Sequence, residues 1–110
     1  MVIDFNNIKE EALPRFKGGE GHVNCRAFND GDNKIMSMSL EPGCTIGYHK
    51  HEGTCEIIHI ISGTGHFIYD GTKEPVAAGS VHYCPDGHSH SMHNDGDTPL
   101  EYIAIVVPQK

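Results

Sequence analysis

Apolar and polar residues alternate with a period of two along most of the chain after His22. Val23, Cys25 and Ala27 alternate with polar neighbours, and the pattern returns between Ile35 and Leu40. Because successive side chains of a strand point to opposite faces, this pattern indicates half-buried strands. It predicts strands at about 23–27, 35–40, 44–51, 56–62, 66–69, 78–85, 90–94 and 100–107. Eight or more short strands at this spacing predict an all-β sandwich or barrel.

Turn-forming residues separate these predicted strands. Asp70-Gly71 follows residues 66–69 and is the strongest hairpin signal in the chain. Segment 56–62 differs from the other strands, because it is nearly all isoleucine around His59 and so predicts a strand that is buried on both faces. Thirteen glycines, six prolines and no tryptophan are also typical of many short strands and turns.

The N-terminal residues lack this alternation. Asn7 followed by Glu10 resembles a capping box, which predicts a short helical piece over 7–13 that ends before Pro14. The glycine-rich segment 18–21 has no following Lys-Ser/Thr pair. We therefore interpret it as a flexible link rather than a phosphate-binding loop.

Length, charge and the absence of targeting signals limit the classes of protein to which this chain can belong. With 110 residues, we expect one domain over 1–110, with an N-terminal segment at 1–22 and a barrel core at about 34–107. The net charge of −7 argues against nucleic acid or an anionic membrane as partner. The first residues lack a signal-peptide pattern, and no apolar run reaches the ~18 residues of a membrane span, so we expect a cytoplasmic protein. Without C-x-x-C spacing, four reduced thiols are expected at Cys25, Cys44, Cys55 and Cys84.

Histidines and one glutamate form the candidate chemical site. His49 and His51 are two residues apart, so both side chains lie on the same face of a strand. Glu56 follows a short turn and can approach them from an adjacent antiparallel strand, and His90 begins a further strand. Three imidazoles and one carboxylate suit one divalent transition metal, such as iron, manganese, nickel or zinc. Four such ligands leave positions open for water or substrate, which is typical of catalytic metal sites.

Two motifs resemble those of the cupin superfamily. They are Gly43-x5-His49-x-His51-x4-Glu56-x6-Gly63 and Gly79-x5-Pro85-x-Gly87-x2-His90-x3-Asn94. The segment 64–78 between them is similar to the linker of small cupins. The resemblance implies a cupin-type jelly-roll β-barrel, a homodimer, and a metal inside the barrel mouth held by His49, His51, Glu56 and His90. It also implies a structural role for Asn94.

The remaining histidines have competing interpretations. His88 lies two residues before His90, but the Gly87-x2-His90 spacing favours His90 as the ligand. We expect surface or dimer-contact positions for His59, His66, His82 and His93. An extra histidine near the metal would be a natural general base, and we assign that role to none of them.

Several further side chains line the predicted interior or lie near it. Alternation predicts inward positions for Ile58, Ile60, Met92, Phe67, Tyr69, Met36 and Met38, as barrel core or as the wall of an apolar pocket. Tyr48 and Tyr83 could each add a hydroxyl. Arg26 could clamp a substrate carboxylate, although a surface ion pair is the more common use. Cys55 should point away from Glu56.

Two functions fit these features. The first is a metal-dependent enzyme acting on a small organic molecule, as an oxygenase or as an isomerase or lyase. The second is a non-catalytic module that binds a small ligand at the metal. The expected single-domain organisation, without an output domain, favours the enzyme. Catalytic residues and substrate stay unassigned. The strand 100–107 and the N-terminal segment are candidates for pairing across a dimer.

Overall fold

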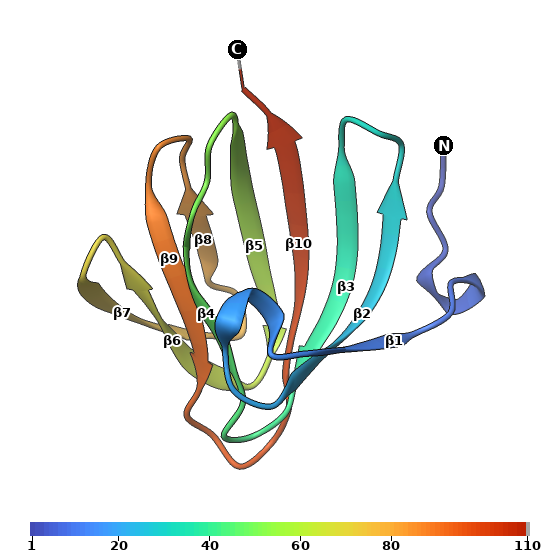
Figure 1. Ribbon diagram of the computed structural model, residues 1–110. Coiled ribbons are helices and arrows are strands. Elements are labelled where there is room, and N and C mark those ends of the chain that lie inside the picture. The colour runs from blue at the N-terminus through green and yellow to red at the C-terminus, as the bar shows by residue number, and fades with distance from the viewer. Residues whose placement is uncertain (110) are drawn as a thin grey trace.

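The computed structural model describes residues 1–109 and contains two antiparallel β-sheets that face each other (Figure 1). The strands are β1 (Glu11–Pro14), β2 (His22–Asn29), β3 (Lys34–Leu40), β4 (Thr45–Lys50), β5 (Thr54–Ser62), β6 (Thr64–Tyr69), β7 (Thr72–Ala77), β8 (Val81–Cys84), β9 (Ser89–Asn94) and β10 (Leu100–Pro108). Two 3₁₀ turns, η1 (Phe5–Asn7) and η2 (Phe16–Gly18), lie near the N-terminus. The all-β jelly-roll prediction is confirmed.

The chain crosses repeatedly between the two sheets. One sheet has the order β1-β2-β3-β10-β5-β8, and the other has the order β4-β9-β6-β7. All neighbouring strands are antiparallel. The predicted hairpin joins β6 to β7 through Asp70 and Gly71, both with positive φ, as a two-residue turn of this type requires.

The core fills the space between the sheets. Residues buried there include Val23, Leu40, Phe67, Leu100 and Ala104, each with no exposed surface. The inward positions predicted from alternation are buried at Ile58, Ile60, Met92, Phe67, Met36 and Met38, whereas Tyr69 is only half-buried. The hydrophobic alternation of the sequence therefore marks the face of each strand that points inward.

The predicted helix over 7–13 is wrong. Asp4, rather than Asn7, caps a single 3₁₀ turn, because its Oδ1 accepts a hydrogen bond of 3.0 Å from the Asn6 amide. The following residues form the edge strand β1, which pairs with β2. Arg26 donates a hydrogen bond of 2.6 Å to the Ile8 carbonyl and lies 3.6 Å from the Glu10 carboxylate. The pairing of β1 with β2 and the contacts of Arg26 together hold residues 8–14 in an extended conformation.

The glycine-rich segment 18–21 is a packed element and not a loose link. Gly19 is buried, and a Cβ atom on it would collide with the Thr45 carbonyl of β4. A Cβ atom on Gly47 of β4 would in turn collide with the Lys17 carbonyl. Glycine at both positions lets two backbones touch, which seats η2 against β4.

Two predictions about the six-stranded sheet are also wrong. The outer face of β5 is open, with Ile57 and Ile61 exposed by 37% and 49%, so this strand is buried on one face only. The strand predicted at 100–107 is β10, which pairs with β3 on one side and β5 on the other. It has no free edge for a partner chain.

Two further features bear on the predicted class. The four cysteines are free thiols, as expected. Among residues 1–109 no helix has the length and apolar character that a membrane crossing needs.

Candidate metal centre

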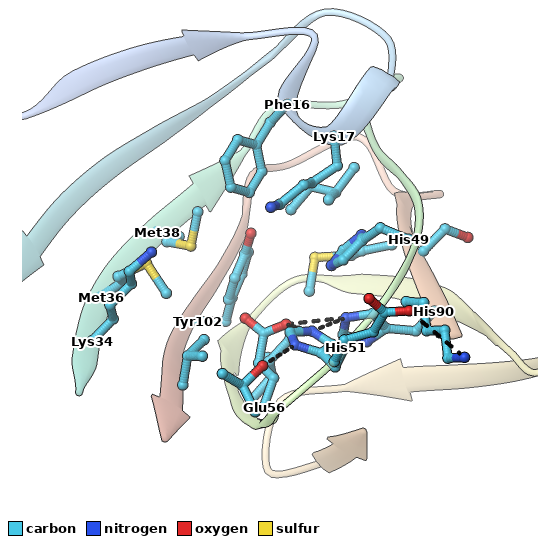
Figure 2. A pocket seen from close by; sticks show the side chains of 18 of the residues that line it. Phe16, Lys17, Lys34, Met36, Met38, His49, His51, Glu56, His90 and Tyr102 are labelled. Carbon is cyan, nitrogen blue, oxygen red and sulfur yellow. Dashed lines mark hydrogen bonds and ion pairs between the residues drawn. The ribbon is translucent and has the colours of Figure 1, made fainter. Parts of the chain in front are cut away.

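Three neighbouring strands bring together the four residues named from the sequence. His49 lies on β4 opposite His90 on β9, and Glu56 lies on β5 of the other sheet. His51 follows the end of β4, where the chain crosses to β5. One ligand atom from each of the four residues lies within 4.8 Å of the others, which is a spacing that could hold a metal ion. Figure 2 shows these side chains converging at one side of a pocket.

The contacts within this cluster are short and join atoms that could each bind a cation. The Glu56 Oε1 atom lies 3.2 Å from His51 Nε2 and 3.0 Å from His90 Nε2, and the two Nε2 atoms are 3.1 Å apart. Lone pairs of neutral imidazoles and a carboxylate repel one another at such distances. A shared proton or a metal ion resolves this repulsion, so the donor set fits a divalent cation.

Hydrogen bonds on the far side of the rings favour the form that binds metal. The His49 Nδ1–H group donates to the Gly47 carbonyl at 2.8 Å, which leaves Nε2 with its lone pair. His51 Nδ1 lies 3.0 Å from the Thr54 hydroxyl. Such partners fix the tautomer and the orientation of a metal-binding imidazole.

Electrostatics favour the metal-binding forms of Glu56 and His49. Burial acts to raise the pKa of Glu56, but hydrogen bonds from His51 and His90 outweigh it and lower this pKa to about 2. Burial lowers the pKa of His49, although the hydrogen bond to Gly47 acts in the opposite direction. The anionic form of Glu56 and the neutral form of His49 are the forms in which these two groups bind a metal.

His82 was expected at the surface and is instead buried behind the cluster, with 4% exposure. Its Nδ1 lies 3.2 Å from Glu74 Oε1, and its Nε2 lies 3.0 Å from His90 Nδ1. Burial lowers its pKa to about 4, with a further contribution from His90, so the ring is neutral near pH 7. Because the carboxylate must accept from Nδ1–H, the Nε2 atom accepts from His90. The contact with His82 therefore uses His90 Nδ1 and leaves Nε2 as the atom that faces the cluster, 3.0 Å from Glu56 Oε1.

The other histidines lie outside this arrangement. His88 is paired with the Asp70 carboxylate and with the Tyr69 hydroxyl, and it is not part of the ligand cluster. His59 is exposed, as expected. His66 and His93 are half-buried, stack with ring centroids 4.5 Å apart, and involve Asp95 at 2.6 Å from His66.

The cluster opens onto a cavity of about 440 Å³. The opposite wall is mostly apolar and comes from η2, β3 and β10, through Phe16, Lys17, Met36, Met38 and Tyr102. Lys34 and Lys50 also line the cavity, and the Lys50 amine lies 3.8 Å from Glu52.

A tyrosine that the sequence did not single out lines this cavity. Tyr48 and Tyr83 are 53% and 52% exposed, and neither lines the cavity. Tyr102 is 2% exposed and lines it. The missed signal is the alternation of Leu100, Tyr102 and Ala104, which places all three on the inner face of β10.

Comparison with known proteins identifies related sequences. The family model described as a cupin domain matches residues 36–106. An oxalate-binding protein from Thermotoga maritima is 35% identical over 113 residues, which cover 97% of this chain and 93% of that protein.

Solved structures with the same architecture include close and distant ones. The crystal structure of a predicted oxalate decarboxylase from Thermotoga maritima superposes with a TM-score of 0.93 at 34% identity, and covers 99% of this chain and 100% of that one. The Cnp3 cupin domain of Schizosaccharomyces pombe gives a TM-score of 0.81 at 9% identity, over 99% and 74% of the two chains. The second match shows a shared fold alone.

Proposed function

Because this chain belongs to the cupin family, we propose that it holds one divalent transition metal and binds a small carboxylate, oxalate first, at that metal. The metal ligands are His49, His51, Glu56 and His90. The observation that carries the proposal is the convergence of these four side chains, within 4.8 Å, on a cavity of about 440 Å³. A cavity of this size suits a small ligand.

The choice of ligand class rests on the relative named for binding oxalate, which is 35% identical along almost the whole chain. A metal bound here, whether iron, manganese, nickel or zinc, would act as a Lewis acid or redox centre towards an oxygen ligand. The chain supplies the orientation. Glu56 contributes the negative charge, while Gly47, Thr54 and His82 hold the three imidazoles from behind.

Catalysis on the bound acid is the second candidate function. Four protein ligands leave further metal positions open, and a similar structure is described as a predicted oxalate decarboxylase. An oxygenase and an isomerase or lyase remain alternatives within this class. The non-catalytic binding module shares the first step, which is metal-dependent capture of the acid.

The test begins with elemental analysis of protein purified without chelator, beside a Glu56→Gln, His90→Ala double variant. We expect about one equivalent of metal in the parent protein and its loss in the variant. A His88→Gln variant, altered outside the cluster, should keep its metal. Calorimetric titration with oxalate then tests binding, and carbon dioxide release or oxygen uptake tests turnover. Absence of metal in the parent protein after reconstitution under reducing conditions would refute the proposal.

We also propose a cytoplasmic homodimer of single cupin domains spanning 1–110, with the barrel core at about 34–107 and no nucleic-acid or membrane partner. Four exposed apolar residues share the outer face of β5 and β8, namely Ile57, Ile61, Val81 and Tyr83. A patch of this kind favours contact with a second copy. Light scattering should report a dimer, and Ile61→Glu should shift it towards monomer. A parent protein that is monomeric at high concentration would contradict the assignment.

A further inference from the structure

The hydroxyl of Tyr102 is a buried polar group that the fold leaves without a partner. Tyr102 is 2% exposed, and its hydroxyl makes no hydrogen bond to any residue within 1–109. Buried polar groups are almost always hydrogen-bonded, because an unpaired one costs its full desolvation free energy. Figure 2 shows this hydroxyl at the end of the ring that points away from the metal ligands and towards Phe16 and Lys17.

The environment keeps this hydroxyl a neutral donor. Burial, followed by the nearby charge of Glu56, raises the pKa of Tyr102 well above its usual value of 10. Phe16, Met36 and Met38, which line the same part of the cavity, offer side chains without an acceptor oxygen. An oxygen atom of a ligand in the cavity would therefore satisfy the hydroxyl.

Lys17 lines the same cavity as Tyr102. Its backbone is in the left-handed region at φ 55°, as is that of Arg15 at φ 48°. The contact between Gly19 and Gly47 holds this strained turn in place. The Lys17 amine lies 5.5 Å from the centre of the Phe16 ring. It forms no ion pair with the carboxylates of residues 1–109.

The cavity is lined by three carboxylates, from Asp32, Glu52 and Glu56, and by a large share of the cations of the chain. The chain has eight lysines and arginines and a net charge of −7, yet Lys17, Lys34 and Lys50 all line this one cavity. Lys50 is near Glu52, which leaves Lys17 and Lys34 as cations outside the ion pairs of the described chain. A lysine outside any ion pair can attract an anionic ligand even on an acidic protein.

We propose that Tyr102 and Lys17 form a recognition pair for the second oxygen-bearing group of a diacid whose first group is bound at the metal. The Tyr102 hydroxyl donates a hydrogen bond to a carboxylate oxygen, and Lys17 supplies the opposite charge. The inference rests on the proposed metal-dependent carboxylate binding. It extends that function, because the recognition pair would select dicarboxylates over monocarboxylates.

The first experiment compares dissociation constants by calorimetry on metal-loaded protein, with oxalate, malonate and acetate as probes. Tyr102→Phe should weaken the tighter-binding diacid about tenfold or more. Lys17→Gln should weaken it about threefold and reduce the effect of added salt. Binding of acetate should change less than twofold in both variants. The matched controls are Tyr48→Phe and Lys73→Gln, which alter an exposed tyrosine and an exposed lysine outside the cavity.

The second experiment uses thermal unfolding, with and without the diacid. Tyr102→Phe removes an unpaired hydroxyl, so without ligand its melting temperature should equal or exceed that of the parent protein. The stabilisation by added diacid should be smaller in the variant, in line with its weaker binding. A lower melting temperature together with unchanged diacid affinity would show that Tyr102 has a structural role, and would overturn the inference.

The outcomes separate this inference from the function on which it rests. If metal-loaded parent protein binds the diacid, and both variants bind it equally well, only the recognition pair is refuted. If the parent protein holds metal but binds none of the three acids, carboxylate binding and the recognition pair are both refuted. Equal weakening of acetate and diacid would also refute the pair, because selection for the second carboxylate would be absent.

Discussion

The two walls of the cavity differ in how far the chain itself satisfies their polar groups. The metal wall is the side of the cavity that carries the four candidate ligands. On it, His49, His51 and His90 each have a hydrogen-bond partner behind the ring. On the opposite wall, the Tyr102 hydroxyl has no partner within residues 1–109, and Lys17 has no ion pair there. The metal wall is preorganised by the protein, whereas the opposite wall is completed by what it binds.

The two walls are also held in different ways. Antiparallel register between β4 and β9 sets His49 against His90. The turn η2, which carries Lys17, depends on two glycines that permit close backbone contact. Separate substitutions can therefore disturb each wall by itself.

The largest effect is expected from removing the glycine contact under η2. Gly19 has φ −76°, which alanine tolerates, so Gly19→Ala tests crowding alone. Collision with the Thr45 carbonyl should cost about 3 kcal/mol in the free energy of unfolding, measured by urea denaturation. Gly96→Ala is the control, because its Cβ atom would meet the Thr64 side chain at 3.0 Å and should cost about 1 kcal/mol or less. Equal costs would show that η2 is not held by backbone contact.

An acid titration of metal-free protein tests the support behind the metal wall. His82 has a pKa of about 4 when folded, against 6.5 for the unfolded side chain. Between pH 4 and pH 6.5 the His82 side chain is protonated in the unfolded chain but stays neutral in the folded protein. Stability present above pH 6.5 should therefore fall as the pH drops towards 4, by about 2 to 3 kcal/mol. His82→Gln should flatten this slope, and an unchanged slope would contradict the assignment.

A smaller effect is expected on metal affinity when the hydrogen bond behind His90 is lost. His82→Phe keeps an aromatic ring stacked on Phe67 but removes the acceptor for His90 Nδ1–H. The metal dissociation constant should rise about 10- to 100-fold in a chelator competition assay. His82→Gln, with an amide oxygen as acceptor, should restore part of the loss. No difference between the two variants would show that the wall needs no support of this kind.

The smallest effect is expected at His88, which is near His90 in sequence but pairs with Asp70. His88→Gln should change the metal dissociation constant less than twofold in the same assay. A tenfold loss would add His88 to the metal wall and would redefine the ligand set.

The sequence predicted the metal wall better than the opposite wall, for physical reasons. The period-two spacing of His49 and His51 and the turn before Glu56 are local features, so the positions of these residues follow from short segments. The inward position of His82 depends on the register of β8 against β5, in which His82 is opposite Ile58. The sequence of one strand alone does not determine this pairing.

The predicted helix failed because tertiary pairing overrode a local capping signal. Residues 11–14 form β1 against β2, and Arg26 holds the preceding backbone. The open outer face of β5 was missed for a related reason, since a run of isoleucines indicates apolar surroundings without saying whether the same chain supplies them.

The central place of β10 has a consequence for the order of assembly during synthesis. All four residues of the candidate metal cluster precede β10 in the chain, whereas β10 supplies Tyr102 and lies between β3 and β5. These pairings join residues far apart in sequence, and such contacts form slowly. Until β10 is made, β3 and β5 present bare edges that can pair with other nascent chains. Conditions that slow translation near residue 100 should therefore favour aggregation over barrel closure.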